Sequence, residues 1–126
     1  MRKWILLAAA TMLMAQPALA QHKHGETKGP NGGPVEDVAG VHAELVTSGN
    51  AITFNILDED NKPVSTKAYT GSVLVSSGSE RETITLAPSG DSALKGEAKK
   101  PIAAKASITL MVKTDKGKSG QARFAR

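Results

Sequence analysis

Residues 41–56 read Val-His-Ala-Glu-Leu-Val-Thr-Ser-Gly-Asn-Ala-Ile-Thr-Phe-Asn-Ile, and this stretch decides the fold. From Val41 to Val46 apolar and polar side chains alternate, as in a strand that buries one face. After four turn-forming residues the alternation returns, at Ile52, Phe54 and Ile56. The stretch therefore predicts two antiparallel strands joined as a hairpin.

Short strands of the same kind continue toward the C-terminus. They are expected at about 68–76, 80–87, 93–98, 107–113 and 120–125, with turn-forming residues between them. Seven or eight short strands spaced about 8–12 residues apart are typical of an antiparallel sandwich or a small barrel. Residues 95–105 are rich in lysine and alanine, but Gly96 and Pro101 limit any helix there. We expect one all-β domain over residues 35–126.

Residues 1–20 follow the pattern of a secretory signal peptide. A basic start precedes an apolar run, Pro17 follows the run, and residues 18–20 form the cleavage site Ala-Leu-Ala. We expect cleavage after Ala20 and a mature chain that begins at Gln21. The apolar run is shorter than the roughly 20 residues that a membrane-spanning helix needs, so no permanent membrane anchor is expected.

Residues 21–34 separate the signal peptide from the first strands. They contain four glycines, two prolines and no aliphatic side chain. Such a segment has little to bury against the entropy lost on ordering it, so it is expected to be a flexible tether.

The composition argues against several classes of function. Without Arg2 and Lys3, fourteen basic residues face twelve acidic ones, so no nucleic-acid partner is indicated. The mature aromatic residues are Phe54, Tyr69 and Phe124, too few for the stacking surfaces that bind single-stranded nucleic acid. The chain has no cysteine and therefore no disulfide scaffold.

Enzymatic activity is not expected either. The chain contains no Gly-x-Ser-x-Gly, no phosphate-binding glycine loop and no His-Glu-x-x-His. Only His42 lies where a fold could hold it rigidly as a general base, so a hydrolase dependent on His42 remains an alternative.

The three histidines suggest metal binding. His22 and His24 lie beside the expected new N-terminus, where imidazole, amine and amide nitrogens suit Cu(II), Ni(II) or Zn(II); the alternative is a polar, solubilising leader. His42 and Glu44 project from one face of a strand about 6.5–7 Å apart, and could share an ion or simply form the solvent side. Because the tether could fold back, we expect a copper or zinc site formed by His22, His24, His42 and Glu44.

Other side chains are weaker candidates for ligands. Glu36 and Asp37 lie close enough in sequence to add oxygen ligands. Met111 is expected to point away from the core, where its thioether would suit Cu(I), although a methionine on a strand more commonly serves packing. Three adjacent acids, Asp58 to Asp60, lack the spacing of a calcium loop and indicate a solvated turn.

Three segments carry a resemblance to a known family: Gly-Pro-Asn-Gly-Gly-Pro-Val at 29–35, Gly-x-His-x-Glu-Leu-Val at 40–46, and Leu-Asp-Glu-Asp-Asn-Lys-Pro-Val at 57–64. Together they resemble a small periplasmic β-domain that stands alone or at the N-terminus of periplasmic adaptor subunits of heavy-metal efflux systems. The resemblance covers roughly residues 29–90 and implies an immunoglobulin-like sandwich, a periplasmic location and transition-metal handling. His42 and Glu44 are its matching polar positions, whereas Asn31 stands where relatives often have histidine.

The sequence thus predicts an exported, monomeric or weakly associating protein that buffers a copper- or zinc-type ion or delivers it to an efflux component. Imidazole must be neutral to bind a metal, so affinity should weaken as the pH falls through about 6.5. The alternative is a non-catalytic interaction module of the cell envelope that docks through a sheet edge, with incidental histidines.

Overall fold

The computed structural model describes residues 28–124. They form eight strands, and none of them lies in a helix. The strands are β1 (Val35–Val38), β2 (Val41–Ser48), β3 (Ala51–Leu57), β4 (Thr70–Ser77), β5 (Glu80–Ser89), β6 (Ala93–Glu97), β7 (Ser107–Lys113) and β8 (Ser119–Phe124). Within this range no helix could cross a membrane.

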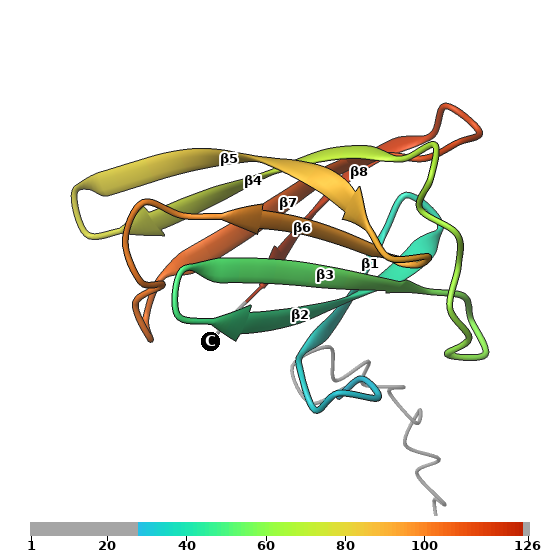
Figure 1. The fold of residues 1–126 in the computed structure, drawn as a ribbon, viewed down its shortest axis with the longest axis horizontal. Coiled ribbons are helices and arrows are strands. Elements are labelled where there is room, and N and C mark those ends of the chain that lie inside the picture. Colours follow the sequence, from blue (N-terminus) through green and yellow to red (C-terminus); the bar gives the residue numbers. More distant parts are fainter. Residues whose placement is uncertain (1–27, 125–126) are drawn as a thin grey trace, which may run out of the picture.

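All eight strands belong to one antiparallel sheet, in the order β1-β2-β3-β6-β5-β4-β7-β8 (Figure 1). Strand β5 joins the two halves, because its residues 80–86 pair with β4 and its residues 87–89 pair with β6. The sheet curls until β1 and β8, the first and last strands of the order, contact each other. The all-β prediction is confirmed, and the strands form one nearly closed sheet.

The core fills the inside of this curled sheet. Phe54 on β3 and Phe124 on β8 meet there, with ring centroids 5.4 Å apart and planes tilted by 53°. Because β3 and β8 are far apart in the strand order, this contact shows that the two halves of the sheet face each other across the core. Most of the other large, fully buried side chains are apolar, namely Ile52, Ile56, Leu94, Ile108, Leu110 and Val73, and the polar exceptions are Glu44 and Thr66.

The seven strands that the sequence predicts are all present, with ends that differ by two residues or fewer. The hairpin of β2 and β3 pairs Ser48 with Ala51, and Gly49 in its two-residue turn has a φ of 58°. This is a type II′ turn, whose first central position glycine favours.

Strand β1 is the element that the sequence analysis did not assign. Its four residues, Val-Glu-Asp-Val, are too few to establish a pattern, and β1 turns into β2 through Ala39 and Gly40. Both have positive φ, 50° and 83°, so the turn is of type I′. Alanine is uncommon in this conformation, which explains why the turn carries no signal in the sequence.

Candidate functional site

The candidate site lies on the outer face of β2. Ala43 and Leu45 point into the core, and His42 and Glu44 therefore project to the opposite face. The predicted sharing of one face by His42 and Glu44 is confirmed. Their surroundings differ, however, because His42 is partly exposed and Glu44 has no exposed surface.

Glu44 is buried because the loop of residues 29–33 covers it. Its Oε2 accepts hydrogen bonds from the backbone N–H groups of Asn31, at 2.8 Å, and Gly33, at 3.0 Å. Its Oε1 accepts a third from Nδ2 of Asn31, at 3.0 Å. Three donors thus replace the water that a carboxylate loses on burial.

The loop itself is closed by hydrogen bonds. The N–H of Gly29 donates to the carbonyl of Gly33 at 2.8 Å, and the N–H of Gly32 donates back to the carbonyl of Gly29 at 2.9 Å. Lys28 pairs with Pro34 in an antiparallel bridge at the base of the loop. A Cβ at Gly29 would overlap the Glu44 side chain, so glycine is what lets the loop lie directly on the carboxylate.

The loop belongs to residues 21–34, which were expected to form a flexible tether. The last seven of these, residues 28–34, are folded onto the sheet, because a buried carboxylate supplies the binding partner that their own side chains lack. Residues 21–27, and with them His22 and His24, lie outside the residues that the structure describes.

His42 contacts the Asp37 carboxylate across the β1–β2 ladder. It lies opposite Asp37, and its Nδ1 is 3.0 Å from Oδ1 of Asp37. The His42 side chain is 29% exposed, and its Nε2 makes no hydrogen bond within residues 28–124. A carboxylate on one ring nitrogen fixes the orientation and tautomer of an imidazole and leaves the other nitrogen to bind a metal.

The remaining predicted ligands are distributed as follows. Asp37 shares the outer face with His42, whereas Glu36 points to the other face of β1 by strand alternation. Met111 on β7 is 37% exposed and points outward, as predicted. No group of three or more His, Asp or Glu side chains in the described range is arranged to hold a metal ion. A complete coordination shell around His42 would therefore need ligands from outside that range.

Both oxygens of Glu44 are engaged, which conflicts with its expected role as a metal ligand. A metal could reach this carboxylate only if the loop left it, with the loss of three hydrogen bonds. Sequence analysis missed this because an acid in an alternating strand looks like a solvent-facing residue. The dense glycines at 29–33 were the available signal that the backbone comes close to another group here.

The acidic turn after β3 behaves as predicted. Oδ1 of Asp58 accepts hydrogen bonds from the N–H groups of Asp60, at 2.8 Å, and Lys62, at 2.9 Å. Such bonds from a carboxylate to its own following backbone are typical of turns that begin with aspartate.

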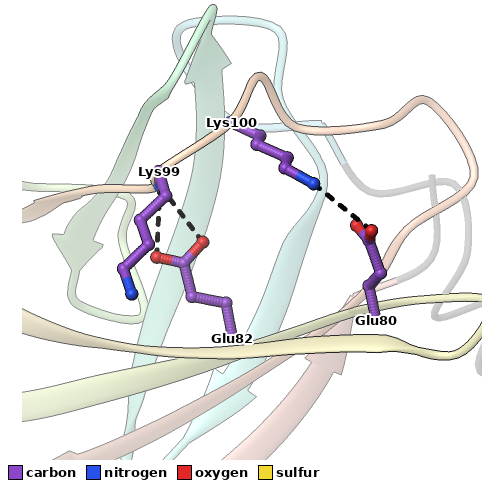
Figure 2. A network of polar contacts seen from close by, with 4 residues as sticks. All are labelled: Glu80, Glu82, Lys99 and Lys100. Carbon is purple, nitrogen blue, oxygen red and sulfur yellow. Dashed lines mark hydrogen bonds and ion pairs between the residues drawn. The ribbon is translucent and has the colours of Figure 1, made fainter.

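Two hollows lie away from His42. A shallow one of about 590 Å³ surrounds Met111 on the outer face of β4, β7 and β8. A second, of about 350 Å³, lies between the β4–β5 hairpin and residues 98–103. Figure 2 shows Glu82 accepting hydrogen bonds from the N–H of Lys99, at 3.1 and 3.2 Å, and Glu80 paired with Lys100 at 3.3 Å. These contacts fasten residues 99–100 to β5.

Comparison with known proteins gives no independent assignment, since no family model, curated protein or solved structure matches the chain.

Proposed function

We propose that the protein is an exported transition-metal-binding protein in which His42 is the fixed ligand, and that it buffers a copper- or zinc-type ion or delivers it to a periplasmic efflux component. The observation that carries this proposal is the Asp37–His42 pair: Nδ1 is held at 3.0 Å by a carboxylate, and the His42 side chain is 29% exposed. This arrangement is the usual one behind a metal-bound histidine.

The rest of the coordination shell comes, in this proposal, from His22 and His24. One imidazole alone binds Cu(II) or Zn(II) weakly, and three imidazoles give a nitrogen-rich set that both ions accept. We favour His22, His24 and His42 as the ligands, with Asp37 orienting the His42 ring. Glu44 does not bind the metal in this proposal and instead holds the loop of residues 29–33.

The resemblance to the N-terminal domain of heavy-metal efflux adaptors supports the same proposal, together with a periplasmic location after cleavage of residues 1–20. It also suggests that the curled sheet is an immunoglobulin-like sandwich. The division of β5 between β4 and β6 is compatible with this, because it separates the sheet into two halves that face each other.

The interaction module is the weaker alternative. It needs an open sheet edge, and the two end strands of the order, β1 and β8, contact each other; next to them, a Cβ on Gly120 would lie only 2.8 Å from the N of Ala39 in the turn after β1. That contact leaves no room for a partner strand at this point.

Calorimetric titration of the untagged protein with Cu(II) and Zn(II) near pH 7.5 tests the proposal. The protein should be expressed with its own leader, and mass spectrometry of the purified form checks the expected start at Gln21. We expect one ion per chain, and His42→Ala should lower the affinity at least tenfold. Absence of binding, or binding that His42→Ala leaves unchanged, would refute the assignment.

Asp37→Asn examines the orienting carboxylate separately. It should weaken metal binding by about 10–100-fold, because the His42 ring loses the partner that fixes its tautomer. Asp60→Asn, in the exposed turn after β3, is the matched control and should bind as the wild type does.

A further inference from the structure

We infer that Asn31 is a site of spontaneous deamidation, that its contact with Glu44 slows this reaction, and that the reaction releases the loop of residues 29–33 from β2. Asn31 and Gly32 form the one Asn-Gly pair in the sequence. Asparagine loses its side-chain amide most readily before glycine, because no side chain hinders the glycine nitrogen as it approaches. The site lies wholly within residues 28–124 and does not depend on the metal-binding proposal.

The reaction needs solvent water as its only co-reactant. The backbone nitrogen of Gly32 attacks Cγ of Asn31, the bond from Cγ to Nδ2 breaks, and ammonia leaves with the proton of the attacking nitrogen. Water then adds to either carbonyl carbon of the resulting cyclic imide and opens it to aspartate or isoaspartate. Nothing is oxidised or reduced, and either product carries one new carboxylate in place of the neutral amide.

The folded loop leaves this pair open to solvent. Asn31 and Gly32 are both exposed, and a Cβ placed on Gly32 would have no atom within 4 Å. Gly32 also has a φ of 79°, a conformation that glycine adopts without strain. Crowding therefore does not protect the pair from the reaction.

Hydrogen bonds engage both reacting groups instead. Nδ2 of Asn31 donates to Oε1 of Glu44 at 3.0 Å, and the N–H of Gly32 donates to the carbonyl of Gly29 at 2.9 Å. The N–H of Asn31 is fixed as well, on Oε2 of Glu44 at 2.8 Å. The leaving amide and the attacking nitrogen must both give up these bonds before they react. Deamidation therefore waits for a local opening of the loop.

The product cannot restore the original contact. A carboxylate at position 31 has no N–H to donate, and its negative charge would lie where Nδ2 stood, 3.0 Å from Oε1 of Glu44. Like charges this close repel each other, and isoaspartate also adds a carbon to the backbone between the two donors of the loop. Because the amide does not re-form in water, release of the loop is irreversible.

The first experiment compares the rates of deamidation in warm, mildly alkaline buffer by peptide mass spectrometry. A blocked synthetic peptide of residues 28–34 gives the rate of the free sequence, and we expect Asn31 in the intact protein to react at least about tenfold more slowly. Glu44→Gln should remove most of this protection. Glu82→Gln is the matched control, because Glu82 also accepts backbone hydrogen bonds but from Lys99, and it should react as the wild type does.

The comparison with the peptide needs no variant, so it stands even if Glu44→Gln does not fold. Fragmentation of the proteolytic peptide must place the change at Asn31 and not at Asn50, which precedes alanine. A peptide that does not deamidate, or an intact protein that deamidates at Asn31 as fast as the peptide, would overturn the inference. So would a folded Glu44→Gln protein that reacts at the wild-type rate.

The second experiment examines release of the loop. Ion exchange separates the deamidated protein by its added negative charge, and amide hydrogen exchange is then measured on both forms. The N–H of Gly33, which donates to Oε2 of Glu44 at 3.0 Å, should lose its protection in the deamidated form, while the amides of β3 and β7 keep theirs. Equal protection of Gly33 in the two forms would show that the loop stays on the carboxylate and would refute its release.

Discussion

Glu44 is an ionisable side chain with no exposed surface, held by Asn31 and Gly33. Burial of a carboxylate costs several kcal/mol unless hydrogen bonds replace its water. Because all three donors come from one loop, the loop and the carboxylate stabilise each other. Backbone hydrogen bonds within the loop, and one from the N–H of Leu45 to the carbonyl of Pro34, add to this contact.

Asn31→Asp should disturb this arrangement more than any other isosteric change in the loop. The new carboxylate has no Nδ2 donor, and its charge lies where that donor stood, 3.0 Å from Oε1 of Glu44. We expect the free energy of unfolding at pH 7 to fall by about 1–3 kcal/mol, measured by urea denaturation. Asn31→Ala, which loses the donor without adding charge, should cost less. Equal stability of the two variants would contradict the proposed repulsion.

Tyr69 lies directly before β4, and its side chain is buried. Burial raises the pKa of its phenol above the ordinary value, and the negative charge of Asp115 raises it further. The folded state thus holds the phenolic proton more tightly than the unfolded state. This contribution to stability is fully present below about pH 10, the unfolded value, and is lost as the pH rises through the folded value.

Tyr69→Phe tests this linkage. We expect the free energy of unfolding to fall more steeply above about pH 10 in the wild type than in the variant, because the variant has no phenol to ionise. Urea denaturation at several pH values from 8 to 11 measures the two slopes, and parallel curves would disprove the coupling.

At the scale of the elements, the turn at Gly49 sets the register of β2 on β3. This register brings Leu45 opposite Phe54 in the core. Gly49→Ala places a side chain at a φ of 58°, with no atom close enough to clash with it, so the cost is conformational alone. We expect about 1–2 kcal/mol of lost stability in thermal or urea unfolding. Ser48→Ala, at the neighbouring exposed position, should change stability far less, and an equal loss would show that the turn type is not the cause.

Seven strands could be predicted because each is bounded by turn-forming residues and most carry apolar side chains at alternate positions. Strand β1 could not, since four residues and a type I′ turn that begins with Ala39 give no local signal. The Asp37–His42 pair depends on that turn, because the turn sets the register of β1 on β2. The alternation of β2 therefore predicted the position of His42, but nothing in the sequence predicted Asp37 as its partner. The burial of Glu44 was hidden for a related reason, because the covering loop contacts it across more than ten residues of sequence.

The order of the strands in the sheet could not be predicted from the sequence either. Strand β6 lies between β3 and β5, although β4 follows β3 along the chain. Local patterns report which side chains face inward, and they do not report which strand is the neighbour. The neighbour of a strand depends on contacts between residues far apart in the sequence, of which that between Phe54 and Phe124 is an example.

On the scale of the whole molecule, the contact between β1 and β8 closes the curled sheet. The sequence has glycine at position 120, where a Cβ would lie 2.8 Å from the N and 3.2 Å from the Cα of Ala39. Both neighbouring atoms belong to backbone and cannot turn aside as a side chain could. The absence of a side chain at this position therefore lets the two end strands approach.

Gly120→Ala should force β1 and β8 apart. We expect a loss of about 1–3 kcal/mol in urea denaturation, the usual cost of an overpacked contact, while Ser119→Ala on the same strand stays close to the wild type. Amide hydrogen exchange should accelerate in β1 and β8 before it does so in β3 or β5, because the strain lies where the sheet closes. Since β1 also carries Asp37, the same substitution should weaken the metal binding that we propose for His42. A Gly120→Ala protein as stable as Ser119→Ala, with unchanged exchange in β1, would mean that the two end strands do not meet as described.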